Sequence, residues 1–412
     1  MGSGTRSGLD VEHPRTRSFR TKAGFVGFAV CCLVILATAC SDPSPRNEPM
    51  GHDPWTPGPH PVANTTVRVE LTDRIAVVEI WYPGTIAVET PDTILDFEDS
   101  ELGRDMLDGL MQQSPLNCTT RTTQSLRNAT ARVGLEELPL LIFSHCHNCG
   151  RYSSFSLAER LASHGMVVLS MDHAGALPFT MNAAGEPLSL DQLTKRSDDI
   201  TRLIDKALDG SLFRLARATQ PLKIDSDRIG LFGHSFGSVT AGLVTQNDTR
   251  ISAVAGLAAP MENVFLPGVI MTDITVPVLL ILAEEDNSIQ EIGNDFIRDN
   301  YSAANPPAWQ IDLADAGHWS VSDLCGLTAA FSAGCGSGTR HSAERSGEPF
   351  DFMPVARGIT LTQRALTSFF IGYLNDRTDA LERLESLNDM RDVRVQSKVL
   401  STRNESEIDA AR

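Results

Sequence analysis

Basic residues are scarce in this sequence, which has 35 Lys and Arg against 52 Asp and Glu and a formal net charge of −17. Nucleic-acid binding relies on clustered Lys and Arg, so no nucleic-acid partner is expected. The same deficit disfavours electrostatic adsorption of the protein to anionic lipid. We interpret the acidity as a property that keeps the surface soluble.

The sequence also offers little that could span a membrane. The apolar run from Ala23 to Ala39 is short for a membrane-spanning helix. It follows a basic region and ends in small residues before Cys40, which is signal-peptide anatomy. These small residues resemble the lipobox of bacterial lipoproteins, in which that cysteine is acylated after cleavage, although Ala37 stands where Leu is usual. Ordinary secretory cleavage near Ala39 and an uncleaved anchor are the alternatives.

The signal-peptide features and the composition of the rest of the chain predict four parts. They are a signal peptide at 1–39, a Pro- and Gly-rich tether at 40–62, a folded domain at 63–376 and a charged tail at 377–412. The tether is expected to hold the folded domain away from a membrane. The protein is therefore expected in the cell envelope or secreted, with membrane contact only through a lipid anchor at Cys40.

Five of the eight cysteines lie beyond the signal peptide and Cys40. Disulfides persist outside the cytoplasm, so these five are candidates for pairing. Cys325 and Cys335 flank a short loop rich in small residues and are the best candidate pair. Cys118 is then left to join Cys146 or Cys149, with one thiol over, and the spacing does not choose between them.

Hydrophobic periodicity predicts an α/β fold with a mostly parallel central sheet and helices on both faces. Residues 66–71 and 75–81 alternate as in an antiparallel hairpin. The region 83–137 is weakly patterned and is expected to cover the site or the surface. Apolar runs typical of buried strands then alternate with helical spacing. Such strands are expected at 138–143, 166–171, 228–232, 251–257, 276–282 and 309–313, and helices at 155–164, 190–208, 238–244 and 359–374.

The pentapeptide Gly233-His234-Ser235-Phe236-Gly237 lies between a predicted strand and a predicted helix. In this context a G-x-S-x-G motif predicts a sharp turn that raises the serine hydroxyl above the end of a sheet. The flanking glycines allow the turn and the close approach of strand and helix. Ser235 is therefore the candidate nucleophile.

A serine nucleophile needs a histidine base that is oriented by a carboxylate. Asp286 follows the predicted strand 276–282, at the edge where parallel sheets build their sites, with Glu285 as the alternative acid. His318 follows the predicted strand 309–313 and is the candidate base. Glu284 is expected in solvent and His234 is expected to point elsewhere.

An ester hydrolase also needs backbone N–H groups that stabilise the oxyanion of its intermediate. Phe236, directly after the nucleophile, is expected to provide one donor. The loop after strand 138–143 is expected to provide the other, from His147 or alternatively Cys146. The spacing of cysteines and histidines in this loop is too tight for one tetrahedral zinc site, so no metal is predicted. His173, after Asp172, is interpreted as half of a structural pair with that residue.

Three motifs together resemble the plasma-type platelet-activating-factor acetylhydrolases and the wider dienelactone-hydrolase-like bacterial esterases. They are Ser144-His145 in the oxyanion loop, Leu169 to His173 at the next strand end, and the pentapeptide. Arg196-Ser197-Asp198-Asp199 is similar to an Arg-x-x-Asp segment of these relatives. The resemblance implies an α/β-hydrolase fold that cleaves carboxylic esters through an acyl-serine without a cofactor.

Two positions depart from the resemblance. In the plasma acetylhydrolases the acid follows the first strand after the helix that begins at the pentapeptide. This chain reads Gly256 to Pro260 at that position, without Asp, which favours Asp286. Cys146 stands where relatives usually have Gly. A small-molecule or lipid ester is the expected substrate class. A catalytically silent lipoprotein that binds an apolar ligand, and a hydrolase of amides or thioesters, are the alternatives.

Overall fold

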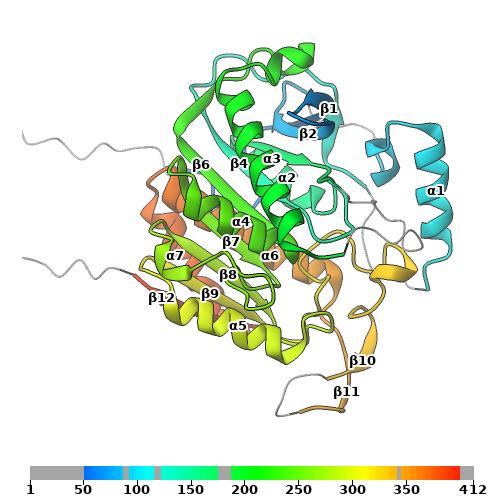
Figure 1. Ribbon diagram of the computed structural model, residues 1–412, viewed down its shortest axis with the longest axis vertical. Helices are drawn as coiled ribbons and strands as arrows, with labels where there is room; N and C mark the ends of the chain where they lie inside the picture. Colours follow the sequence, from blue (N-terminus) through cyan, green and yellow to red (C-terminus); the bar gives the residue numbers. More distant parts are fainter. Residues whose placement is uncertain (1–50, 87–91, 116–121, 175–186, 341–344, 400–412) are drawn as a thin grey trace, which may run out of the picture. The chain divides into compact units, whose positions relative to one another are not determined.

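The computed structural model describes residues 51–86, 92–115, 122–174, 187–340 and 345–399. Its main feature is a ten-stranded sheet in the order β12-β9-β8-β7-β6-β4-β5-β2-β1-β3 (Figure 1). The strands of this sheet are β1 (Val62–Glu70), β2 (Ile75–Pro83), β3 (Ser125–Arg127), β4 (Leu138–Ser144), β5 (Val167–Met171), β6 (Ile224–His234), β7 (Ile251–Leu257), β8 (Val278–Ala283), β9 (Ala308–Leu313) and β12 (Val393–Lys398). Strands β10 (Ser337–Thr339) and β11 (Pro349–Asp351) form a separate hairpin.

The central strands of the sheet, from β5 to β9, pair in parallel. Strands β4, β5 and β8 are buried along their whole length, as continuous apolar runs predict for strands covered on both faces. On one side β2 pairs antiparallel with β5 and with β1, and on the other β12 pairs antiparallel with β9. The parallel centre brings the carboxyl ends of β4, β6, β8 and β9 to one edge of the sheet.

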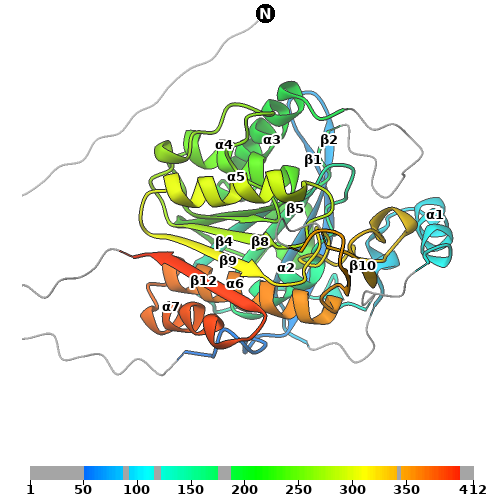
Figure 2. The same cartoon turned by 90° about the horizontal axis from the view of Figure 1, so that it is seen from below.

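Helices cover both faces of the sheet. Figure 2 shows α3, α4 and α5 on one face and α2, α6 and α7 on the other. The buried side chains form two apolar layers accordingly, one containing Val239 of α4 and the other containing Phe369 of α6. The helices are α1 (Glu101–Gln112), α2 (Phe155–Ser163), α3 (Leu190–Leu208), α4 (Phe236–Asn247), α5 (Gln290–Ala303), α6 (Val355–Leu374) and α7 (Thr378–Glu385). The fold is thus α/β with a mostly parallel sheet, as predicted.

The charged tail expected from residue 377 contains structure that belongs to the domain. Helix α7 packs on α6 and buries Leu384, and β12 extends the sheet beyond β9, with Val395 opposite Ile311. The sequence predicted no strand after 309–313 and a tail from residue 377, so this is a correction. Its cause is that β12 alternates only weakly and carries polar residues on an edge, where a strand has one neighbour.

The tether expected at 40–62 is also partly built into the domain. The N–H groups of Gly58 and His60 donate to the Oγ and the carbonyl oxygen of Ser163, at 2.8 and 3.1 Å, and Trp55 packs against the core. Residues 1–50, including Cys40 and the predicted signal peptide, lie outside the described residues. The weakly patterned region 83–137 contributes α1 and the short strand β3, neither of which was predicted.

No helix within the described ranges is both long and apolar enough to cross a membrane. Nor do those ranges contain a group of three or more His, Cys, Asp or Glu residues arranged to hold a metal ion.

Candidate active site

The turn between β6 and α4 holds Ser235 in a conformation that few non-glycine residues adopt, with φ 56° and ψ −123°. Its N–H donates to the carbonyl oxygen of Leu257 on β7 at 3.0 Å, and the residue is half-buried. The glycines on either side are required by close approach. A Cβ on Gly233 would lie 2.0 Å from the carbonyl oxygen of Gly237, and one on Gly237 would lie 1.9 Å from that of Ser144. The turn therefore has the geometry of a nucleophile elbow.

Asp286 lies three residues beyond β8 and is fully buried. Its Oδ1 accepts hydrogen bonds from the N–H groups of Ser288 and Ile289, at 2.8 and 2.9 Å. Its Oδ2 lies 2.7 Å from Nδ1 of His318. Because the two backbone donors hold one oxygen, the carboxylate presents the other to the imidazole in a defined orientation.

His318 lies in the loop after β9 and its side chain is buried. Its Nδ1 donates to Asp286, which leaves the proton-free Nε2 as an acceptor in the neutral ring. No described group makes a hydrogen bond to this buried Nε2. A neutral imidazole with one nitrogen on a carboxylate and the other available is the arrangement a general base requires.

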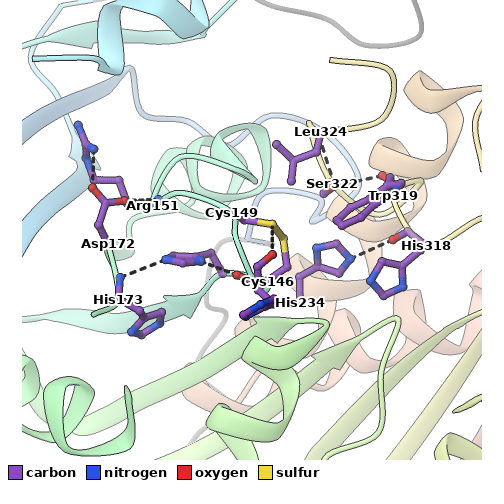
Figure 3. The surroundings of a disulfide bond; sticks show 12 residues. Cys146, Cys149, Arg151, Asp172, His173, His234, His318, Trp319, Ser322 and Leu324 are labelled. Carbon is purple, nitrogen blue, oxygen red and sulfur yellow. Dashed lines mark hydrogen bonds and ion pairs between the residues drawn. A yellow bond between two sulfur atoms is a disulfide. The ribbon is translucent and has the colours of Figure 1, made fainter. Parts of the chain in front are cut away.

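The backbone of His318 is held by His234 from the pentapeptide (Figure 3). Nε2 of His234 donates to the carbonyl oxygen of His318 at 2.9 Å, and the two ring centroids lie 5.0 Å apart. Trp319 contacts both rings edge-on, at 4.7 Å from His318 and 5.5 Å from His234. Burial lowers the pKa of His234 well below its ordinary value, so it stays neutral. The side chain of His234 thus contacts His318 and supports the candidate base.

Glu285, the alternative acid, has a different partner. Its Oε1 accepts from Nη1 of Arg340 at 2.9 Å, and the same nitrogen contacts Asp315 at 2.6 Å. The structure therefore brings Asp286 to His318 and Glu285 to Arg340. Glu284 is half-buried rather than exposed, which differs from the expectation that it faces solvent.

The loop after β4 is closed by a disulfide between Cys146 and Cys149, whose Cα atoms lie 5.2 Å apart. The interpretation that either cysteine pairs with Cys118 is wrong. Within the loop Asn148 adopts φ 55°, and this turn brings the two sulfur atoms together. Cys118 itself lies outside the described residues. The other expected pair, Cys325 and Cys335, is joined in the structure with a Cα separation of 6.0 Å.

His147 lies between the two bonded cysteines, and its ring centroid is 6.1 Å from that of Phe236. The two residues expected to provide oxyanion donors are thus neighbours across the elbow. Neither of their backbone N–H groups donates to an acceptor in the part of the chain that the structure describes. Two backbone donors without partners beside the turn of the candidate nucleophile are what an oxyanion hole requires.

Arg196 of α3 contacts both this loop and Phe236. Its Nη1 and Nη2 donate to the carbonyl oxygens of His145 and Cys146, at 2.9 and 3.5 Å. Its guanidinium lies over the ring of Phe236, 4.4 Å from the centroid. Burial lowers the pKa of Arg196 to about 9. One cation thus ties together the segments of both expected donors.

Two further histidines line this region. Nδ1 of His145 donates to the carbonyl oxygen of Cys146 at 2.7 Å, and its Nε2 accepts from the N–H of His173 at 3.2 Å. Nε2 of His173 contacts Oγ of Ser144 at 2.9 Å. The interpretation of Asp172 and His173 as a pair is wrong. Asp172 accepts instead from the N–H and Nη1 of Arg151, both at 2.8 Å, because the two residues lie just beyond β5 and their side chains reach different partners.

Sequence reasoning missed the supporting roles of Arg196, His234 and Arg340. The Arg-x-x-Asp resemblance drew attention to Arg196 but gave no contact. The position of His234 does indicate a supporting role, since the residue before the nucleophile lies on the strand side of the turn. Nothing in the sequence around Arg340 indicates that it neutralises Glu285.

Comparisons with known proteins agree with this geometry. Residues 50–180 match the model of the family described as platelet-activating factor acetylhydrolase, isoform II. The chain is 25% identical over 244 residues to the platelet-activating factor acetylhydrolase of Bos taurus, covering 50% of this chain and 54% of the relative. It therefore spans about half the length of that curated relative. The resemblance inferred from the motifs is confirmed.

A solved structure shares the fold. The ferulic acid esterase from Streptomyces cinnamoneus matches with a TM-score of 0.60 and 20% sequence identity, over 82% of this chain and 97% of the esterase. At this identity the likeness concerns the fold. The chain has an α/β-hydrolase fold, as the sequence predicted.

Proposed function

We propose that this protein is a carboxylic ester hydrolase that works through an acyl-serine on Ser235. The observation that carries the proposal is His318, whose Nδ1 donates to the buried carboxylate of Asp286 while its buried Nε2 has no described partner. A serine nucleophile needs such a base, with one ring nitrogen oriented by a carboxylate and the other available. By their names the curated relative is an acetylhydrolase and the structural neighbour is an esterase, which supports hydrolysis of an acyl bond.

The proposed reaction has two halves. Oγ of Ser235 attacks the ester carbonyl carbon while Nε2 of His318 takes its proton, and Asp286 stabilises the imidazolium that forms. The N–H groups of Phe236 and His147 stabilise the negative oxygen of the tetrahedral intermediate. The intermediate collapses, and His318 returns the proton to the leaving alcohol. Water then attacks the acyl-serine with the same base, which releases a carboxylic acid and restores Ser235.

The substrate class is a small-molecule or lipid ester, and the proposal includes no cofactor. The relatives' names mention an acetyl group and ferulic acid, which differ in size and polarity. The geometry around Ser235 supports ester cleavage in general, because triad mechanics are shared while pocket shape decides the acyl group.

We further propose that the protein acts outside the cytoplasm, after removal of residues 1–39 and acylation of Cys40. The disulfides Cys146–Cys149 and Cys325–Cys335 support an oxidising compartment. In a bacterial host fed an alkyne-labelled fatty acid, the full chain is expected to incorporate the label. Cys40→Ser is expected to abolish it, and label retained in that variant would refute the anchor.

The serine mechanism is tested with a fluorophosphonate probe and short-chain nitrophenyl esters. The wild-type protein is expected to bind one probe per chain and to hydrolyse the esters, whereas Ser235→Ala does neither. Ser226→Ala, on the exposed start of the same strand, is the matched control and is expected to behave as wild type. Labelling that survives Ser235→Ala, or no labelling at all, would sink the proposal. Nitroanilide and thioester analogues in the same assay separate the alternative bonds.

A further inference from the structure

A pocket of about 560 Å³ lies between α2 and α6, apart from the candidate active site. None of Ser235, Asp286 and His318 lines it. The two helices lie on the same face of the sheet (Figure 2). Its volume falls within the roughly 300–1,000 Å³ of typical small-molecule sites. The mechanism proposed above makes no use of this pocket.

The pocket walls are held by hydrogen bonds. Nε2 of Gln363 on α6 donates to the carbonyl oxygen of Ser156 on α2 at 2.9 Å and so joins the two helices. The segment 57–61 closes one side through the hydrogen bonds of Gly58 and His60 to Ser163. A Cβ on Gly58 would lie 2.1 Å from the carbonyl oxygen of Ser163, so this close approach requires glycine. The pocket is therefore largely preformed.

Glu159 on the pocket wall has one satisfied oxygen and one without a partner. Its Oε1 accepts from the N–H groups of Gln124 and Ser125 and from Oγ of Ser125, at 2.8, 2.9 and 2.7 Å. Its Oε2 is buried and has no hydrogen-bond partner, and the residue is only 3% exposed. Burial raises the pKa of Glu159 to about 8, so the carboxyl is neutral at pH 7 and can donate an O–H.

Arg160, next to Glu159, lines the same pocket. Its Nη2 donates to Oε1 of Gln363 at 3.3 Å, but its Nη1 is buried without a partner. Burial lowers the pKa of Arg160, and the nearby guanidinium of Arg364 lowers it further. No carboxylate of a described residue pairs with Arg160 or Arg364, although the chain has a net charge of −17. An uncompensated cation is thus held at the wall beside a neutral acid.

The rest of the wall includes apolar side chains. They are Pro57, Pro61, Val62, Ala356 and Ile359. A ligand that suits the whole pocket therefore has an anionic, acceptor-rich head and an aliphatic body. A carboxylate fits this head position, because it can accept from a guanidinium and from a neutral carboxyl in short charge-assisted hydrogen bonds.

We propose that the pocket between α2 and α6 binds an aliphatic carboxylate, with the head group at Arg160 and Glu159 and the chain along Ile359 and Val62. This site is separate from the ester-cleaving site and its occupancy does not depend on Ser235. Since a carboxylic acid is also what an ester hydrolase releases, the site is suited to retain or sense product.

The probe is sodium dodecanoate, titrated by calorimetry into the full chain carrying Ser235→Ala at concentrations below micelle formation. One equivalent is expected to bind. Arg160→Gln is expected to raise the dissociation constant at least tenfold, because the head group loses its cation. Arg298→Gln, at a half-buried arginine on α5, is the matched control and is expected to leave binding unchanged. Dodecanol and dodecyltrimethylammonium are expected to bind at least tenfold more weakly.

A second variant fills the pocket without changing its charge. Ala356→Trp replaces an exposed residue on the rim, so the fold is expected to persist, and it is expected to abolish dodecanoate binding. With Ser235 intact, the Arg160→Gln and Ala356→Trp variants are both expected to hydrolyse nitrophenyl acetate at the wild-type rate. This result separates the binding proposal from the catalytic one. Dodecanoate binding that survives Ala356→Trp or Arg160→Gln, or equal binding of dodecanol, would overturn the proposal.

Discussion

The two sides of Ser235 both contain buried histidines, but their neighbours give these histidines opposite properties. On one side His318 donates to the carboxylate of Asp286 at 2.7 Å. On the other, His145 and His173 bond only to backbone groups and a hydroxyl, and they face the guanidinium of Arg196. Burial first, and Arg196 second, lower the pKa of both these histidines well below the ordinary value.

Burial alone therefore does not make a histidine a base. All three rings are buried to within 2% of full enclosure. A carboxylate neighbour stabilises the imidazolium, so its ring can take and return a proton during reaction. A cationic neighbour keeps the ring neutral, so it can act only as a fixed donor and acceptor. This difference supports the proposal that His318, beside Asp286, transfers the proton, while His145 and His173, beside Arg196, hold the loop in position.

The largest loss of activity is expected when the carboxylate beside His318 is removed. Asp286→Asn keeps the size of the side chain but removes the charge that stabilises the imidazolium. The amide can also favour the wrong histidine tautomer. We expect kcat for nitrophenyl esters to fall roughly 10⁴-fold, as loss of a triad carboxylate does elsewhere. Steady-state kinetics with a fluorophosphonate titration of active sites measures the change.

Glu285→Gln is the matched comparison, since it removes a neighbouring buried carboxylate that pairs with Arg340. It is expected to lower thermal stability and to change kcat by less than tenfold. A larger loss in Glu285→Gln than in Asp286→Asn would reverse the assignment of the acid.

The next largest loss of activity is expected when Arg196, beside His145 and His173, is replaced. Arg196→Lys retains the charge but cannot donate from two nitrogens in a fixed plane to two carbonyl oxygens. We expect the loop of His147 to shift and kcat to fall by roughly 10²-fold, the lower end of the cost of losing one oxyanion donor. The KM is expected to change little. Arg202→Lys on the same helix is the control, and an equal loss there would show that the effect is not specific to the loop.

Much of the fold could be predicted because the chain obeys simple periodicities. Continuous apolar runs marked β4, β5 and β8, and the pentapeptide marked the turn at Ser235. The elements that were missed gain their stability from their surroundings. Helix α1 buries only Leu107 and Met111, and β12 is a polar edge strand held by β9. Such segments have little pattern of their own, so their structure depends on contacts distant in sequence.

The candidate site was predictable to the extent that it follows chain order. The positions of Asp286 and His318 after successive strands were sufficient to propose them, because parallel strands bring such loops to one edge. The choice between Asp286 and Glu285 required knowing which side chain faces His318, and that depends on the turn made by Ser288 and Ile289. The contacts of Arg196 and His234 are long-range, so they leave no local signal.

A smaller effect is expected from opening the loop that carries His147. The double variant Cys146→Ser, Cys149→Ser removes the disulfide that brackets this residue. We expect kcat to fall roughly tenfold, because small displacements of a stabilising group weaken catalysis. The double variant Cys325→Ser, Cys335→Ser is the comparison and is expected to lower the melting temperature with little change in kcat. Equal kcat losses in the two variants would show that the first disulfide has no special relation to the oxyanion donors.

The smallest expected effect concerns the pH dependence of stability, and it tests whether His173, beside Arg196, is neutral in the folded protein. Burial, and then the guanidinium of Arg196, lower the folded-state pKa of His173 well below the ordinary value of 6.5, so the unfolded chain binds a proton first as pH falls. Its contribution to stability is thus present above pH 6.5 and lost as pH falls below it. Replacing it by His173→Gln is expected to reduce the loss of unfolding free energy between pH 7.5 and 5.5 by about 1 kcal/mol. Urea denaturation at the two pH values measures this. Ser144→Ala removes the same hydrogen bond without a titrating group and is expected to lower stability equally at both, so an unchanged slope in His173→Gln would contradict a neutral His173.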